Sequence, residues 1–577
     1  MFRHVKNALL FACVLGLTFP AAATTEVARE DTVIFDTDQP IEETQSYNVL
    51  AGNMNRQHGA HQLMWEPLFI LNYEAGQIEP WLATDYASND DATEWTINLN
   101  GAVEWSDGEV FNANDVLFTV NAVLENKTLL ADDAVRLRSQ VLSVEAKSPT
   151  QIVFQLKESN PRFILENFAV QFFSSFLIMP EHVWRGKDLQ NFTFAEPIGT
   201  GPYTLTSTSK GGAVWDRNDE WWGAKSGFME LPEPKRVVYL HSANREERAA
   251  RIAANEIDAA HDVSLADFTQ MAAQNPQIIV WREESPYAWY SPCPWQLDFN
   301  TTRAPWDDKT VRSAVSLLID RQEIVDLVFS GSTIASRTLF LEHGGMFAFV
   351  EALEAAGLAV PTRSQATSGL AMLESKGWQK GAGGYLQLDG RTLSGTLHVD
   401  ASLEHAAAIA KVITGQLQAA GLQVDAKMVD DRASWKQALA SGDFEMALTN
   451  LACGSVSEPW TSMQRYTNEG LEGRGETASG LNNISRWNTQ ASKDYAELVD
   501  QLGSMKLLDP STIETMTKAY RLLVDEVPFT PLVQAPALLP YNTTYWVNWP
   551  QEYNNFNHPA FWWGSAHSIL HTLQKAL

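Results

Sequence analysis

The chain has 577 residues, of which 45% are hydrophobic, and a formal net charge of −28 at pH 7. One domain seldom exceeds about 250 to 300 residues, so this length predicts two or three domains with separate cores. The acidic balance excludes a nucleic-acid-binding protein, which needs clustered Lys and Arg, and the apolar content excludes a disordered chain.

The N-terminus has the order of a secretory signal. Arg3 and Lys6 precede an apolar run over 8–19, and small residues follow to Ala23. This order predicts a signal peptide over 1–23 and a soluble periplasmic protein, because no later segment has the ~18 consecutive apolar residues that span a bilayer. Cys293 and Cys453 would be the mature cysteines, and the sequence leaves open whether they form a disulfide.

The stretch 65–124 has a clear local pattern. Apolar residues alternate with polar ones over 95–99, which predicts a half-buried strand. Asn112 can cap a helix whose apolar stripe runs from Val116 to Leu124. Further along, the expected helices cover 245–258, 311–318, 368–378, 409–420 and a last one opened by Asp509 and Pro510; the expected strands cover 152–156, 422–429 and 444–450. This alternation of strands and helices is typical of an α/β protein.

Several motifs have a common resemblance. They are Glu66-Pro67-Leu68, Trp105-Ser106-Asp107-Gly108, the GTGPY turn at 199–203, WDRNDEWWG at 215–223 and the helix VRSAVSLLIDR at 311–321. Their order and spacing resemble the solute-binding proteins of ABC importers in the oligopeptide, dipeptide and nickel class, family 5. The two glycines of GTGPY permit positive φ angles, and Pro202 stiffens the exit of the turn.

The resemblance implies two α/β lobes of the type II-like periplasmic-binding-protein fold, joined by a hinge, with an extra α+β subdomain inserted in the first lobe. The implied first lobe is discontinuous and covers 24–66, 196–293 and 529–577. The inserted subdomain would cover 67–195, and the second lobe 294–528.

The same resemblance implies a binding protein and no enzyme. It would capture an extended solute, an oligosaccharide or an oligopeptide, by hinge closure and deliver it to an ABC permease in the inner membrane. We expect a monomer without cofactor. One alternative is a secreted glycoside hydrolase, whose two carboxylates cannot be located by sequence among seventy Asp and Glu residues; another is a nickel- or haem-binding member of the class.

The twenty tryptophans are the main source of candidate ligand contacts. Indole offers a broad apolar face and one N–H donor, which suits sugar rings and apolar peptide side chains. Family peptide binders place an aspartate near the position of Glu458, where it meets the ligand's ammonium group, but this sequence reads LACGSVSEPW and departs from their pattern. The candidates are Asn53, Asn55, Trp289, Trp295, Asn450, Glu458, Trp460, Trp546, Trp549, Trp562 and Trp563.

Two histidine pairs bear on the metal alternative. His58 and His61 lie three residues apart, and His567 and His571 lie four apart, on one face if that segment is helical. Such a pair can ligate a metal, but an ordinary helical face explains it equally well. We expect no metal site.

Overall fold

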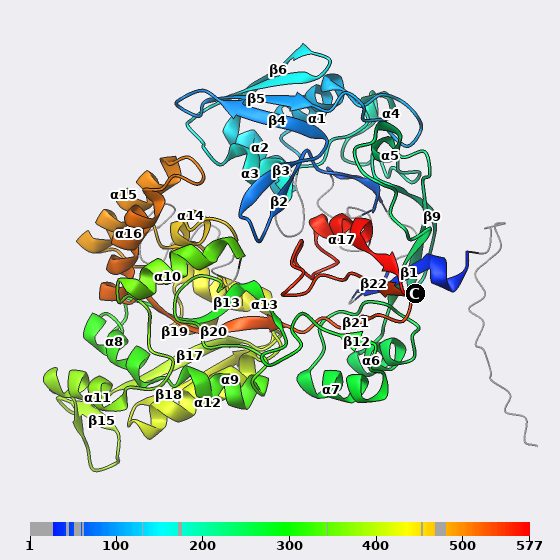
Figure 1. Cartoon of the computed structure of the whole chain (residues 1–577). Coiled ribbons are helices and arrows are strands. Elements are labelled where there is room, and N and C mark those ends of the chain that lie inside the picture. The colour runs from blue at the N-terminus through cyan, green and yellow to red at the C-terminus, as the bar shows by residue number, and fades with distance from the viewer. Residues whose placement is uncertain are drawn as a thin grey trace, which may run out of the picture.

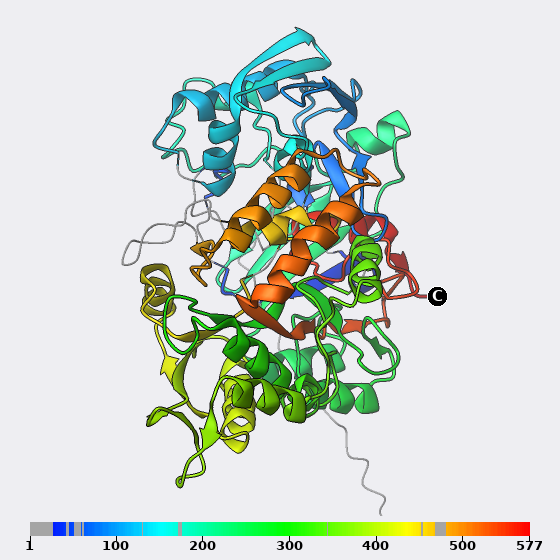
Figure 2. The same ribbon diagram turned by 90° about the vertical axis from the view of Figure 1, so that its left-hand side faces the viewer.

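The computed structural model describes residues 27–37, 39–41, 46–50, 59, 63–129, 131–170, 176–342, 344–451, 454–467 and 481–577. They form two α/β lobes and a smaller unit attached to the first. In Figure 1 the second lobe lies at the left, the first lobe at the right and the inserted subdomain at the top. Figure 2 looks from the side of the second lobe, with the inserted subdomain above it.

The first lobe is built on a sheet with the strand order β9-β10-β11-β1, which Ala259 continues towards β21 and β12 through isolated bridges. β1 pairs in parallel with β11 and, through Phe35, with Ala259. The strands are β1 (Thr32–Thr37), β9 (Tyr203–Ser209), β10 (Gly212–Arg217), β11 (Arg236–His241), β12 (Ile278–Ile279), β21 (Tyr541–Asn542), β22 (Trp546–Val547) and β23 (Gln574–Lys575). The helices are α5 (Trp222–Ser226), α6 (Arg245–Ala253), α7 (Leu265–Gln274) and α17 (His567–Thr572).

The second lobe has a five-stranded sheet with the order β18-β17-β19-β13-β20, in which β17, β18 and β19 are parallel. Its strands are β13 (Trp289–Phe299), β17 (Ser394–Asp400), β18 (Gln423–Val429), β19 (Met446–Thr449) and β20 (Phe529–Ala537), with β14 (Gln379–Lys380), β15 (Leu386–Leu388) and β16 (Arg391–Thr392) in a separate small sheet. Its helices are α8 (Lys309–Leu318), α9 (Arg321–Phe329), α10 (Phe347–Ala355), α11 (Ala366–Ser375), α12 (Ala406–Ala419), α13 (Arg432–Ser441), α14 (Trp460–Met463), α15 (Gln490–Ser504) and α16 (Thr512–Glu526).

The inserted subdomain contains an antiparallel sheet with the order β4-β5-β7-β6 and a smaller sheet with the order β3-β2-β8. Its strands are β2 (Phe69–Asn72), β3 (Gln77–Pro80), β4 (Ala83–Ser88), β5 (Glu94–Leu99), β6 (Val141–Ser148), β7 (Gln151–Leu156) and β8 (Ala169–Val170). Its helices are α1 (Ala113–Glu125), α2 (Asp132–Gln140), α3 (Phe163–Asn167) and α4 (Glu181–Trp184). Its buried side chains belong to the same hydrophobic cluster as the first-lobe core.

Two antiparallel strands, β13 and β20, cross between the lobes. In β13, Trp289 packs in the first-lobe core and Trp295 in the second. In β20, Val533 packs in the second-lobe core, whereas Ala537 packs against the first. We therefore propose that the last segment of the first lobe begins inside β20, after Val533, and not at 529.

The local predictions for 65–124 are confirmed. The alternating residues form β5, and α1 begins after Asn112, whose side chain accepts the amide of Asn114 at 2.9 Å, while Asp115 accepts the Asn112 amide at 2.9 Å. Farther along the chain, Gly421 follows the C-cap of α12 with a φ of 97°, as a glycine in that position should.

Several helix boundaries were predicted wrongly; the helix expected over 368–378, for example, is α11 and ends at Ser375. The helix expected over 245–258 ends at Ala253, because Asn255 turns the chain with a φ of 63°. Asp258 is then free to pack inward, where it accepts Arg29 at 2.7 Å. The last long helix is not capped by Asp509; it begins at Thr512, and Asp509 accepts the amide of Ser511 at 2.8 Å in the preceding turn.

The motif VRSAVSLLIDR places two arginines inside the second lobe, Arg312 in α8 and Arg321 at the start of α9. Arg312 donates to the carbonyls of Glu526 and Val527 at the C-terminal end of α16, and of Trp306. Arg321 donates to the carbonyls of Pro531 and Ser316, among others, and has no carboxylate partner in the described part of the chain. Burial lowers the pKa of Arg312 to about 10 and that of Arg321 to about 9. These guanidinium groups tie the helices to β20 and to the chain just before it.

The carboxyl group of Glu66 joins the first lobe to the inserted subdomain. It is 4% exposed and accepts the indole N–H of Trp81 at 2.9 Å and that of Trp222 at 2.8 Å. Its backbone amide donates to Thr200 Oγ1 at 3.4 Å, and the Thr200 carbonyl accepts the indole of Trp221 at 3.0 Å. Three of the motifs therefore meet at one buried carboxyl group.

The glycines of the GTGPY turn serve this junction, although not through the positive φ angles that glycine permits. Neither Gly199 nor Gly201 has a positive φ. A Cβ on Gly199 would lie 1.9 Å from the Met64 carbonyl oxygen, and one on Gly201 would lie 2.3 Å from that of Leu63. Close backbone approach to the chain just before Glu66 is what requires glycine here.

We predict that Glu66→Gln lowers the free energy of unfolding by about 1–3 kcal/mol at pH 5, because the amide NH2 faces one of the two indole N–H donors. Burial raises the pKa of Glu66 to about 7. The wild type therefore loses stability as the pH rises from about 4.5 through 7, and the difference in unfolding free energy between the wild type and Glu66→Gln should narrow over that range. Urea unfolding at several pH values measures this difference. A difference that is constant with pH would contradict the raised pKa of Glu66.

Candidate functional site

Parallel strands in both lobes end at edges suited to ligand binding. In the first lobe the carboxyl ends of β1 and β11 and the segment after Ala259 share one edge. In the second lobe the carboxyl ends of β17, β18 and β19 share another. Ligands of α/β sheets bind beyond such edges. Arg245, at the start of α6, donates to Glu404, which follows β17, at 2.5 Å, so the two edges are in contact.

Of the twenty tryptophans, only Trp460 and Trp562 are half-buried; all the others are buried. Trp546 donates to the Thr32 carbonyl at 2.9 Å, and Trp549 donates to the Trp546 carbonyl at 2.9 Å and stacks on Tyr541. Both are fully buried core residues, so we no longer propose them as ligand contacts. Trp295 is buried in the second-lobe core and is set aside for the same reason.

Trp562 lies at the first-lobe edge. Its ring stacks on His261, just after Ala259, with ring centroids 4.2 Å apart and an interplanar angle of 23°. The neighbouring Trp563 is 5% exposed and meets Trp289 edge-on at 5.3 Å. Trp562 is therefore the candidate tryptophan at this carboxyl edge that is half-buried and not fully buried.

Glu458 is bound inside the protein. It is 6% exposed and accepts Arg162 Nε at 3.1 Å, the Trp460 amide at 2.9 Å and the Thr461 amide at 3.0 Å. The Arg162 guanidinium lies over the Trp460 ring, with Arg162 Cζ 5.0 Å from the ring centroid. Both carboxylate oxygens are thus occupied, and Glu458 does not present a free carboxylate to a ligand.

The remaining candidates lie around the second-lobe edge or beyond the described residues. Asn450 is half-buried directly after β19. Asn53 and Asn55 lie outside the described residues, as do His58 and His61.

Sequence reasoning missed a polar cluster beneath Asn450. Asp298 of β13 is 1% exposed and accepts Thr449 Oγ1 at 2.6 Å and Gln296 Nε2 at 2.8 Å. Gln296 also donates to Tyr466 Oη. Burial raises the pKa of Asp298 to about 6. The cluster fixes the end of β19 to the crossing strand β13, and its sequence signal is the alternation of polar Gln296, Asp298 and Asn300 with apolar residues in WQLDFN.

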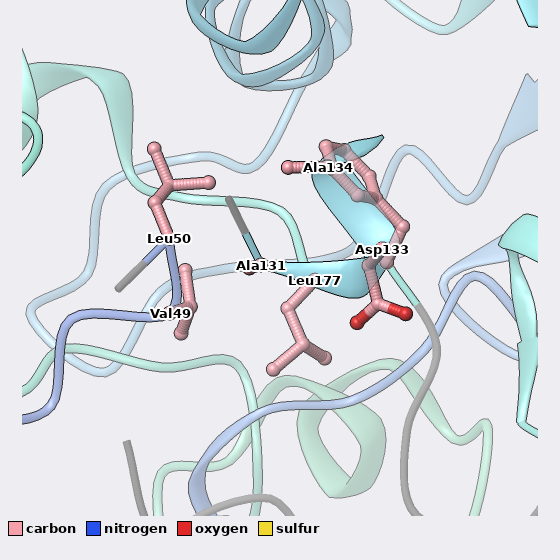
Figure 3. Close-up of a pocket in the computed structure, with 7 residues that line it drawn as sticks. Val49, Leu50, Ala131, Asp133, Ala134 and Leu177 are labelled. Atoms are coloured by element: carbon pink, nitrogen blue, oxygen red, sulfur yellow. The ribbon is translucent and has the colours of Figure 1, made fainter. Parts of the chain in front are cut away.

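The pocket in Figure 3 is not a candidate site. It lies where 49–50 and 176–177 meet the start of α2. Its lining is apolar apart from Asp133, which pairs with Arg136 at 2.9 Å, so it is a packing void.

Cys293 of β13 is disulfide-bonded. The chain's other cysteines, Cys13 and Cys453, lie outside the described residues.

The pair His567 and His571 lies on one face of α17; His567 is buried, and His571 is half-buried with both ring nitrogens shielded from solvent. His567 meets Trp81 edge-on at 4.7 Å, and His571 lies 5.0 Å from Trp221. Burial lowers the pKa of His567 to about 4 and that of His571 to about 3. The described residues include no group of three or more His, Cys, Asp or Glu placed to hold a metal ion. Through its contacts with Trp81 and Trp221, the histidine pair packs beside the Glu66 junction.

We predict that His571→Phe reduces the acid sensitivity of the fold. His571 binds its proton near pH 6.5 in the unfolded chain but only near pH 3 in the folded one, so stability falls as the pH drops below 6.5, by about 1.4 kcal/mol per pH unit for this group. The variant should lose less unfolding free energy than the wild type between pH 6.5 and 4 in urea titrations. Parallel curves for the two proteins would refute the burial of a neutral ring.

Comparison with known proteins assigns the family. Residues 77–472 match the bacterial extracellular solute-binding proteins, family 5 (middle region). The chain belongs to this family. It is 27% identical over 360 residues to the nickel-binding periplasmic protein of Escherichia coli K12 and 25% identical over 345 residues to the glutathione-binding protein GsiB of the same organism. These matches cover 60% and 57% of the chain, and 62% and 60% of the relatives.

Solved structures support the fold. An oligopeptide-binding protein of an ABC transporter from Thermotoga maritima superposes with a TM-score of 0.80 at 20% identity, over 95% of this chain and 100% of that one. The same protein with bound mannohexaose gives 0.71 at 19% identity, over 95% and 99%. NikA from Brucella suis with Fe(III)-EDTA gives 0.73 at 19%, over 94% and 100%. The two-lobed fold class expected from the sequence is confirmed.

Proposed function

We propose that this family 5 protein is an extracytoplasmic substrate-binding protein, which captures an extended solute between its lobes and delivers it to an ABC permease. The observation that carries this proposal is the pair of carboxyl edges in contact through Arg245 and Glu404, on lobes joined by β13 and β20. Two crossing strands permit a hinge, and a ligand that touches both edges favours the closed arrangement.

A neutral oligosaccharide is the ligand class that the side chains favour. Trp562 is a half-buried tryptophan at the first-lobe edge, and an indole suits the apolar face of a sugar ring. Glu458, at the position where peptide binders are expected to meet an ammonium group, is occupied by Arg162. The Thermotoga relative, whose structure contains mannohexaose, supports this class by analogy. An oligopeptide is the second candidate, since other similar proteins are named for peptides.

Three observations bear on the cellular compartment of the protein. The E. coli relative is named as periplasmic, and no helix among the described residues is long and apolar enough to cross a membrane. The disulfide at Cys293 also fits an oxidising compartment. We propose a periplasmic location for the mature protein, and from the family resemblance we expect a monomer without catalytic activity.

We predict that a neutral oligosaccharide from a library of sugars and peptides raises the melting temperature of the purified protein, because a ligand of the native state stabilises it. Calorimetry then gives the Kd. Trp562→Ala should weaken Kd about tenfold, or about 1.4 kcal/mol. Trp378→Phe, which changes a buried indole of the second-lobe core, should leave Kd unchanged.

Three results would count against this account. A peptide that binds while all sugars fail would transfer the proposal to the second ligand class. Hydrolysis of a glycoside would favour the enzyme alternative. An unchanged melting temperature with every compound would oppose the binding function itself.

A further inference from the structure

Arg162 connects the inserted subdomain to the second lobe. It is 2% exposed and lies directly before α3. Its Nε donates to Glu458, 296 residues away, and its terminal nitrogens donate to the carbonyls of Gly503 at 2.6 Å and Leu502 at 3.1 Å. The guanidinium group thus binds a carboxylate and also the C-terminal end of α15, where a cation is favourable.

Glu458 is held ready for this contact by its own segment. Its carboxylate accepts the amides of Trp460 and Thr461, at the start of α14. The side chain of Trp460 lies against the Arg162 guanidinium. The second lobe therefore presents a fixed acceptor with an aromatic wall, and the forked shape of arginine matches it.

A second contact lies beside the first. The tip between β2 and β3 approaches the segment 344–346 so closely that Gly345 N donates to the Tyr73 carbonyl at 3.0 Å. A Cβ on Gly345 would lie 3.0 Å from Gly76 Cα, and one on Gly76 would lie 3.5 Å from Ser457 Cβ. Ser457 directly precedes Glu458, so both contacts involve the same segment of the second lobe.

The inserted subdomain is fastened to the first lobe by buried groups. Glu66 bonds Trp81 of the subdomain and Trp222 of the first lobe, and Trp81 also packs against His567. A hinge motion that separates the lobes must therefore carry the subdomain with the first lobe. The contact between Arg162 and Glu458 is then one that opening breaks.

We propose that Arg162 and Glu458 form a latch through which the inserted subdomain holds the two lobes closed. This inference rests on the hinge closure proposed above and goes beyond it, since it assigns a closing role to the subdomain and does not involve the ligand. In the closed form all three nitrogens of Arg162 have protein acceptors; on opening, water replaces them. The latch therefore biases the equilibrium between open and closed forms.

Ligand affinity depends on this bias. When only the closed form binds tightly, the apparent Kd equals the intrinsic Kd divided by the closed fraction. Loss of the latch lowers that fraction and weakens every ligand by the same factor, whatever its chemistry. A residue that contacts the ligand would instead affect different ligands unequally.

The test is small-angle X-ray scattering of the ligand-free protein, which requires no ligand identity. Arg162→Ala and Glu458→Gln should each increase the radius of gyration relative to the wild type. Glu458→Gln keeps an oxygen for the α14 amides, so it separates the latch from local folding. The double variant should show no larger increase than either single one, because both remove the same interaction. With a bound solute, Kd should weaken on the order of tenfold.

Arg185→Ala is the matched control, because Arg185 lies in the same subdomain, pairs with Glu181 and has a side chain 72% exposed. Its radius of gyration should equal that of the wild type. Equal radii for the wild type, Arg162→Ala and Glu458→Gln, with all three folded by circular dichroism, would overturn the latch. That result would leave the binding function untouched, whereas failure of all solutes to bind would leave the scattering comparison valid.

Discussion

The buried carboxyl group of Glu66 is the interaction on which the architecture depends. Two indole N–H groups from different parts of the fold donate to it, and the backbone around it is approached so closely that only glycine fits at 199 and 201. A buried carboxyl group without these donors would be costly. The motifs that identify the family are therefore a structural junction, which joins the inserted subdomain and the first lobe into one body.

Because the first lobe and the inserted subdomain form one body, motion within the molecule is motion of the second lobe relative to that body. The second lobe is fastened internally by the guanidinium groups of Arg312 and Arg321, both bonded to backbone carbonyls. Between these two bodies run β13 and β20. The polar contacts that also join them include Arg245 with Glu404, Arg162 with Glu458 and the Gly345 amide with the Tyr73 carbonyl, and Leu341 and Val456 of the second lobe pack in the core cluster of the first body. Relative motion is concentrated in the hinge, and these contacts help decide which arrangement is populated.

Sequence periodicity predicted those parts of the fold whose pattern is local. β5 and α1 follow from alternation, helical spacing and the cap at Asn112. The errors occurred where a single residue overrides the pattern, as Asn255 does at the end of α6. The site was less predictable, because the exposure of an indole depends on its tertiary neighbours: Trp546 and Trp562 look alike in sequence, yet the first is core. No local signal pairs Arg162 with Glu458 across 296 residues.

A crystal structure of the protein with its stabilising solute would show directly whether the solute is captured between the lobes. Density for the solute should lie between the two lobes, in contact with residues at both carboxyl edges and with a ring on Trp562, while Glu458 stays bound to Arg162. Density on one lobe alone, or outside the interlobe space, would contradict capture by closure.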